Sequence, residues 1–118
     1  MSEVKTPDSI IRELSEVRTN VARNAQIVRD YESAAMEAQR QLDHEFALAY
    51  KRASGSIEDR KQQAVIDTES FAHARDDTKI ALNYAKARAR GFESELSNLQ
   101  TQARMVELTY KMAGVGET

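Results

Sequence analysis

A heptad repeat of apolar residues, interrupted only once, is the feature that most constrains how this chain can fold. Apolar residues recur at alternating steps of four and three from Leu14 to Ala49 and again from Ile57 to Ala113. This spacing places them along one face of a helix and is typical of a coiled-coil seam. Ser54-Gly55-Ser56 separates the two stretches. The pattern therefore predicts two long helices joined by a turn.

Local signals place the ends of these helices. Thr6-Pro7 favours a helix start, because Thr can cap free N–H groups and Pro is tolerated at the first helical position. Gly55 suits a helix C-terminus because glycine adopts positive φ readily, and Ser56 with Asp59 forms a weakened capping box. We expect a single domain over residues 1–118, with helices at about 7–53 and about 57–113, a turn at 54–56 and a flexible tail at 114–118.

Composition favours the same fold class. The 118 residues suit one domain, and 31% of them are charged while none is Trp. A helix pair buries only one seam, so such a chain is often stabilised by partner chains. We therefore expect an all-α fold, a long antiparallel helical hairpin or coiled coil that forms homo-oligomers.

The predicted seam of the second helix is uneven along its length. Its part from Leu82 to Val106 is apolar, and we expect this part to drive assembly. The predicted oligomer interface consists of Leu82, Phe92, Leu96, Leu99 and Val106.

The part nearer the turn carries polar residues at inward positions. Lys61, Thr68, Arg75 and Thr78 fall in the seam register there. Polar seam residues either fix the register of the helices at a cost in stability or mark a hydrated functional end, and the sequence leaves both interpretations open. Gly91, inside the second helix, predicts a bend or a close contact with a neighbouring helix.

No catalytic constellation is found. The chain has no cysteine, and neither His44 nor His73 has a matching set of metal ligands. There is no glycine-rich phosphate loop. The N-terminus is polar, and no apolar run approaches the ~20 residues of a membrane span. We expect a cytoplasmic protein that is not an enzyme and that has no cofactor, metal or membrane partner.

Charge gathers around the predicted turn. Between residues 50 and 64 there are four basic and two acidic side chains. Basic residues beside an aromatic ring suit single-stranded nucleic acid, since the charges contact phosphates and the ring stacks on bases. The predicted nucleic-acid-binding residues are Tyr50, Lys51, Arg52, Arg60 and Lys61. The alternative interpretation is an ordinary solvated basic face.

Several short motifs give the chain a resemblance to a known family. They are Tyr50-Lys51-Arg52-Ala53-Ser54-Gly55 at the turn, Leu82-Asn83-Tyr84, and Arg90-Gly91-Phe92. In these motifs, between about residues 36 and 113, the sequence resembles phage recombination mediators of the UvsY type. The resemblance implies an oligomeric helical protein that binds single-stranded DNA, displaces single-strand-binding protein and loads a RecA-like recombinase. It implies phosphate contacts for Lys51 and Arg52, and the host cytoplasm as the location if the gene is carried by a phage.

Two other classes of protein share these features. A structural or assembly coiled coil without nucleic-acid binding would use the same heptads, and its function would depend on the seam instead of the turn. A secreted helical hairpin of the WXG type has about this length, but the chain contains no Trp, which disfavours that class.

Overall fold

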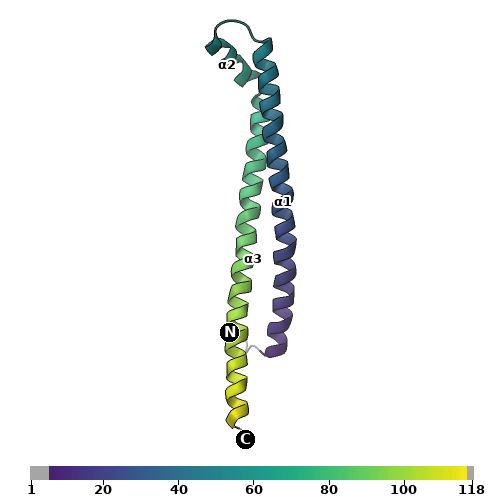
Figure 1. Ribbon diagram of the computed structural model, residues 1–118, viewed down its shortest axis with the longest axis vertical. Helices are drawn as coiled ribbons and strands as arrows, with labels where there is room; N and C mark the ends of the chain where they lie inside the picture. Colours follow the sequence, from purple (N-terminus) through teal and green to yellow (C-terminus); the bar gives the residue numbers. More distant parts are fainter. Residues whose placement is uncertain (1–5, 117–118) are drawn as a thin grey trace. The chain divides into compact units, whose positions relative to one another are not determined.

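The computed structural model describes residues 6–116, and this part of the chain is helical apart from short connections. Figure 1 shows three helices: α1 (Pro7–Arg52), α2 (Ile57–Asp67) and α3 (Glu69–Gly116). No strand occurs within residues 6–116, so the all-α prediction is confirmed. The helices contribute to two compact units, described separately below. Unit 1 combines the chain up to Gln26 with the chain from Ala87 onward, and unit 2 comprises Ile27–Lys86.

Reciprocal side-chain capping fixes the start of α1. The Thr6 hydroxyl accepts a hydrogen bond from the Ser9 backbone N–H at 3.2 Å, and the Ser9 hydroxyl accepts one from the Thr6 N–H at 3.0 Å. These bonds satisfy two N–H groups that a helix start leaves without partners. The start predicted at Thr6-Pro7 is confirmed.

The turn between α1 and α2 has the predicted chemistry. Gly55 has a φ of 108°, the one positive φ within the described residues. Ser56 caps α2, since its hydroxyl accepts from the Asp59 N–H at 3.1 Å and the Asp59 carboxylate accepts from the Ser56 N–H at 3.4 Å. The second bond is long, as expected where Asp replaces the longer Glu of a capping box.

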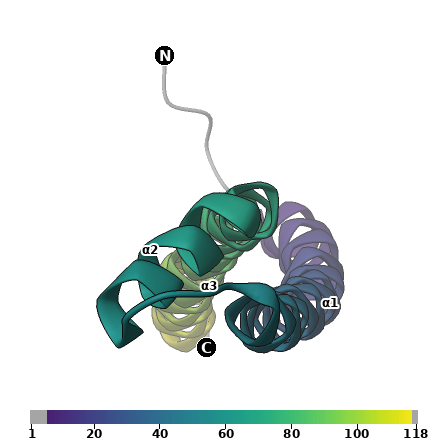
Figure 2. The same cartoon turned by 90° about the horizontal axis from the view of Figure 1, so that it is seen from above.

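The expected second helix is divided at Thr68, which corrects the prediction of one continuous helix from about 57 to 113. Thr68 is 3% exposed and leaves helical geometry, with φ −110° and ψ 14°. Its hydroxyl donates to the Ala64 carbonyl oxygen at 2.7 Å, while its backbone N–H donates to the same oxygen at 3.1 Å. Such back-bonding often accompanies a bend, although Thr19 and Thr101 make the same bond inside helices that stay continuous. At Thr68, α2 turns away from the axis of α3 (Figures 1 and 2).

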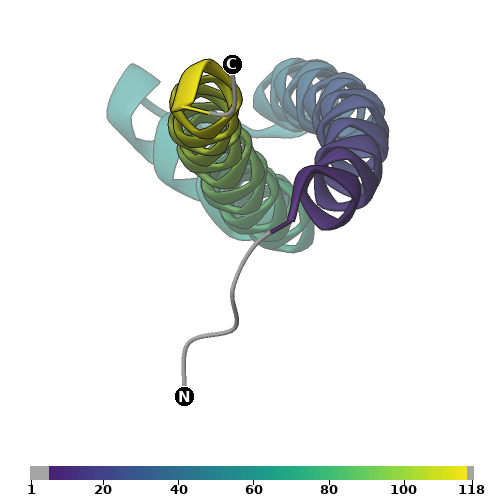
Figure 3. The ribbon, with the colours of Figure 1, turned by 90° about the horizontal axis from the view of Figure 1, so that it is seen from below.

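In unit 1 the first part of α1 runs antiparallel beside the last part of α3 (Figure 3). Ile10, Val17, Asn24 and Leu99 are buried there, and the last three occupy predicted seam positions. Tyr110 and Ala113, also predicted for the seam, are exposed, although Tyr110 still lines a groove together with Pro7 and Ile10 at the start of α1.

In unit 2 the seam is made of small side chains. Ala49, Ala64, Thr68 and Ala85 are each at most 4% exposed. Small seam residues allow helix backbones to approach closely but bury little apolar area. Three predicted seam positions are exposed instead: Tyr31, Ile57 and Lys61. The last two lie on α2, which the kink at Thr68 carries away from α3.

The glycines of α3 neither break the helix nor mark a close contact. The helix continues through Gly91, and a Cβ added there would meet no atom within 4 Å, so no close helix contact occurs there, while a bend at Gly91 stays a prediction. Gly114 does not end the helix either, since no positive φ occurs there and α3 runs to Gly116. Glu117 and Thr118 of the predicted tail lie outside the described residues.

Gly91 and Gly55 therefore make a matched pair of substitutions. Gly91→Ala should raise the free energy of unfolding by about 1 kcal/mol, because alanine lowers the entropy of the unfolded chain without meeting any neighbour. Gly55→Ala should lower it by about 1–2 kcal/mol, because φ is positive and the new Cβ would lie 3.1 Å from Asp59 Oδ2. Urea unfolding followed by circular dichroism measures the free energy of unfolding of both variants. A Gly91→Ala protein less stable than the unmodified protein would show that the surroundings of Gly91 are not open.

Candidate nucleic-acid interface

The five residues predicted to bind nucleic acid lie at the end of unit 2 where α1 stops and α2 starts (Figures 1 and 2). Tyr50, Lys51 and Arg52 belong to the last turn of α1, and Arg60 and Lys61 to the first half of α2. Only residues 53–56 separate the two helices. We call these five residues the tip. The four basic side chains are exposed, and Tyr50 is half-buried.

The acidic residues at the tip are engaged locally. Asp59 accepts the capping bond from Ser56, and Glu58 accepts a hydrogen bond from the Gln62 amide at 3.1 Å. None of the four tip cations forms an ion pair with another residue in the range 6–116. Their charges therefore face solvent, whereas both carboxylates stabilise α2 at its N-terminus, where the helix dipole favours anions.

A purely structural role accounts for part of this arrangement. Lys51 and Arg52 occupy the last turn of α1, where cations interact favourably with the negative end of the helix dipole. Arg60 and Lys61 lie instead just beyond the first turn of α2, where the dipole does not stabilise positive charge. The dipole therefore explains the first pair and not the second.

Two aromatic residues, Phe46 and Tyr50, lie close to the tip cations in sequence, and the structure uses Phe46 partly for packing. Phe46 is half-buried and lines a shallow groove of about 270 Å³ with Leu42, Val65, Ala72 and Arg75. Its ring is thus partly used in packing within unit 2. Tyr50 is the aromatic residue that lies beside the tip cations in sequence and keeps part of its surface exposed.

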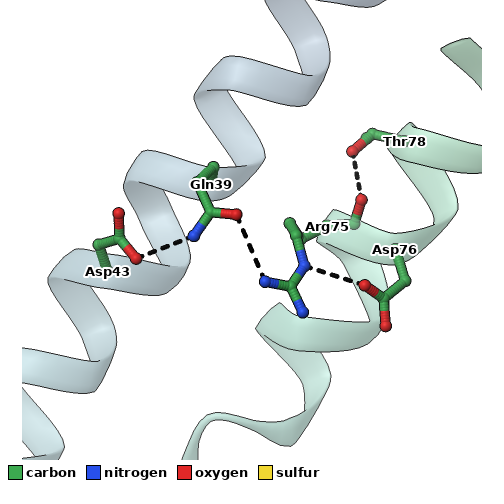
Figure 4. Close-up of polar contacts among 5 residues, drawn as sticks. All are labelled: Gln39, Asp43, Arg75, Asp76 and Thr78. Carbon is green, nitrogen blue, oxygen red and sulfur yellow. Dashed lines mark hydrogen bonds and ion pairs between the residues drawn. The ribbon is translucent and has the colours of Figure 1, made fainter.

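A hydrogen-bonded network crosses the seam of unit 2 (Figure 4). Arg75 Nη1 donates to Gln39 Oε1 at 3.3 Å and Arg75 Nε donates to Asp76 Oδ1 at 2.9 Å, while Gln39 Nε2 donates to Asp43 Oδ1 at 2.9 Å. The network joins α1 to α3 through side chains that fit together at one alignment of the helices. This geometry supports register control as the role of Arg75. Thr78 bonds within its own helix, to the Arg75 carbonyl oxygen at 2.6 Å.

Exposed aliphatic side chains on α2 escaped the sequence analysis. Ile57, Val65 and Ile66 are 66%, 55% and 64% exposed. Ile57 is exposed because the kink at Thr68 removes the start of α2 from the predicted seam. Val65 and Ile66 lie outside the heptad register, and this position off the seam could have predicted their exposure.

The five residues predicted for the oligomer interface lie in the seam within the chain. Leu99 is 6% exposed, and Leu82, Phe92, Leu96 and Val106 are half-buried. The Phe92 ring also lies under the Arg88 guanidinium, 5.9 Å from ring centre to Cζ, at cation–π distance. These side chains hold α3 to α1, and oligomerisation through them stays a prediction.

Searches for other kinds of site give two findings. Within residues 6–116, no group of three or more His, Asp or Glu side chains is arranged to hold a metal ion. No helix in that range combines the length and the apolar character that crossing a bilayer demands. His73 lies 3.6 Å from Glu69 within one helix, and His44 is exposed.

Comparison with known proteins identifies no relative. No protein-family description, curated protein or solved structure matches this chain.

The network around Arg75 can be tested by a double-mutant cycle. Removing Gln39 and Arg75 together, as Gln39→Ala with Arg75→Ala, should cost less than the sum of the single changes, with a coupling of about 0.5–1.5 kcal/mol for one charge-assisted bond at a partly exposed site. Denaturant unfolding gives the four free energies. The pair Gln39→Ala and Arg40→Ala is the control, because Arg40 bonds to Glu37 and not to Gln39. If the coupling between Gln39 and Arg75 is no larger than the coupling in this control pair, Arg75 does not fix the register of the helices.

Proposed function

We propose that this protein binds single-stranded DNA through its tip. The observation that carries the proposal is the set of four exposed cations around one turn, free of ion pairs within the described residues, beside a partly exposed tyrosine. In this account Lys51, Arg52, Arg60 and Lys61 contact phosphates, and Tyr50 stacks on a base. A flexible single strand can follow a small convex end, whereas a rigid duplex meets fewer of these charges.

We further propose that the protein acts as a homo-oligomeric recombination mediator in the cytoplasm, helping to load a RecA-like recombinase in the presence of single-strand-binding protein. The resemblance of the turn motif to UvsY-type mediators supports this finer proposal. Several copies would also add together tip charges that are small in one chain, whose net charge is −2.

A second function, a structural or assembly coiled coil, is favoured by a different observation. Large apolar side chains lie exposed on all three helices, among them Ile11, Met36, Ile66, Met105 and Leu108. Exposed apolar surface of this kind marks contacts with other chains. In this case the tip would be a solvated turn, and substitutions there would leave function unchanged.

Lys51→Ala with Arg52→Ala should weaken binding to a labelled single-stranded oligonucleotide without loss of helicity. Each contacted phosphate contributes about 0.7 to the slope of log K against log salt for a single strand, so the double variant should lower the slope by about 1.4. Fluorescence anisotropy over a salt series measures it, with a duplex of the same sequence for comparison.

Arg12→Ala with Arg18→Ala is the matched control. Both side chains are exposed on α1 in unit 1, so the same charge is removed away from the tip. If both double variants lose the same affinity for the oligonucleotide, binding depends on overall charge and not on the tip. No binding by the unmodified protein at low salt would overturn the proposed function and leave the structural coiled coil.

A further inference from the structure

The surface of α3 that faces away from the seam carries a second heptad repeat. Counting in steps of three and four from Gly91 gives a set of positions two residues out of phase with the seam. We call this set the outer stripe: Gly91, Ser94, Asn98, Thr101, Met105, Leu108 and Met112. All seven residues are exposed, and none is charged.

The outer stripe is unusual for the exposed face of a helix. In a two-stranded coiled coil the face opposite the seam is normally polar and charged. Here Met105, Leu108 and Met112 are 65%, 59% and 69% exposed, and charges lie on either side of the stripe. The same spacing extends back along the sequence of α3 to Ala87, Tyr84 and Ile80.

From this pattern we infer that the outer stripe binds a second copy of the chain, as a parallel, in-register pair of α3 helices. The inference rests on the proposed homo-oligomer but not on DNA binding. It also places the contact on the face opposite the predicted interface residues, which pack within the chain.

The asparagine of the stripe points to a parallel pair. In the register of the outer stripe, Gly91, Asn98, Met105 and Met112 take the first apolar position of each heptad, and Ser94, Thr101 and Leu108 take the second. A single Asn at the first position of a parallel dimer bonds to its counterpart and fixes both register and two-stranded assembly. Asn98 is placed to do this.

Charge complementarity supports the same orientation. The side chains flanking a parallel seam pair with the residue five positions further along on the other helix. Arg90 would then meet Glu95 of the second copy, twice by symmetry, and no like charges would meet along residues 90–112. An antiparallel pair centred on the stripe would instead bring Arg90 near Lys111, a like charge.

A second copy of this chain can supply a matching surface. An in-register pair sets Met105, Leu108 and Met112 against themselves, and sets the small residues Gly91 and Ser94 against themselves, where the helices can approach. A closed twofold pair of this kind covers the apolar part of the stripe on both chains.

Met105→Gln with Leu108→Gln tests the location of the contact. The change should raise the dimer dissociation constant by roughly 100-fold, because four apolar side chains lose their burial, while helicity stays unchanged. Sedimentation equilibrium measures the constant. The control is Met36→Gln with Ile66→Gln, which changes two side chains that are equally exposed but lie off the stripe.

Cysteine cross-linking tests the orientation, since the chain has no cysteine of its own. Asn98→Cys and Met105→Cys, made separately, should each form a disulfide-linked dimer under mild oxidation, and Gln100→Cys, on another face of the helix, should not. An antiparallel pair can bring at most one of the two stripe positions next to its own copy.

The outcomes separate the inference from the proposed oligomer. If the Met105→Gln, Leu108→Gln variant still forms the dimer, the outer stripe is not the contact, although the protein is an oligomer. The same conclusion follows if Gln100→Cys cross-links as fast as Asn98→Cys. An unmodified protein that stays monomeric at every concentration tested would overturn both and would leave DNA binding by the tip unaffected.

Discussion

Packing of α1 against α3 along one narrow seam is the interaction on which the rest of the structure depends. Among the residues that the structure describes, the fully or nearly buried positions are mainly small or polar: three alanines, Asn24 and Thr68 accompany Ile10, Val17 and Leu99. Burial of a large aliphatic side chain contributes about 1.5–3 kcal/mol, and alanine contributes far less. The stability of each unit therefore comes from a few apolar contacts and from hydrogen bonds that fix the alignment of the helices, such as the one from Arg75 to Gln39. A chain with so little buried apolar area gains most from contacts with further copies.

The kink at Thr68 determines what the turn end of unit 2 presents to solvent. At Thr68, whose hydroxyl and N–H share the Ala64 carbonyl, α2 leaves the axis of α3, and Ile57 and Lys61 lie outside the seam. Lys61 is therefore exposed beside Arg60, next to the end of α1. The break turns part of the predicted coiled coil into a short separate helix that carries two of the tip cations.

Much of the fold could be predicted from local signals in the sequence. The cap at Thr6, the positive φ of Gly55, the capping box at Ser56 and the positions of Val17, Asn24, Ala49 and Leu99 in the seam all follow from short-range chemistry or periodicity. The kink did not, because a Thr that bonds back to a carbonyl is compatible with either a straight or a bent helix, as Thr101 in continuous α3 shows. The close helix contact considered for Gly91 is absent, because the cost of glycine in a helix gives no information about its neighbours. For the site, exposure of the tip cations and the capping role of Asp59 were foreseeable from the turn, whereas the hydrogen bond from Gln62 to Glu58 was not.

The most direct test of the central claim, that the tip is the DNA-binding surface, is an amide NMR titration of the protein with a short single-stranded oligonucleotide. The account predicts shift changes concentrated at residues 50–61, which weaken as salt is added. Changes spread evenly along α1 and α3, or confined to the outer stripe, would contradict it.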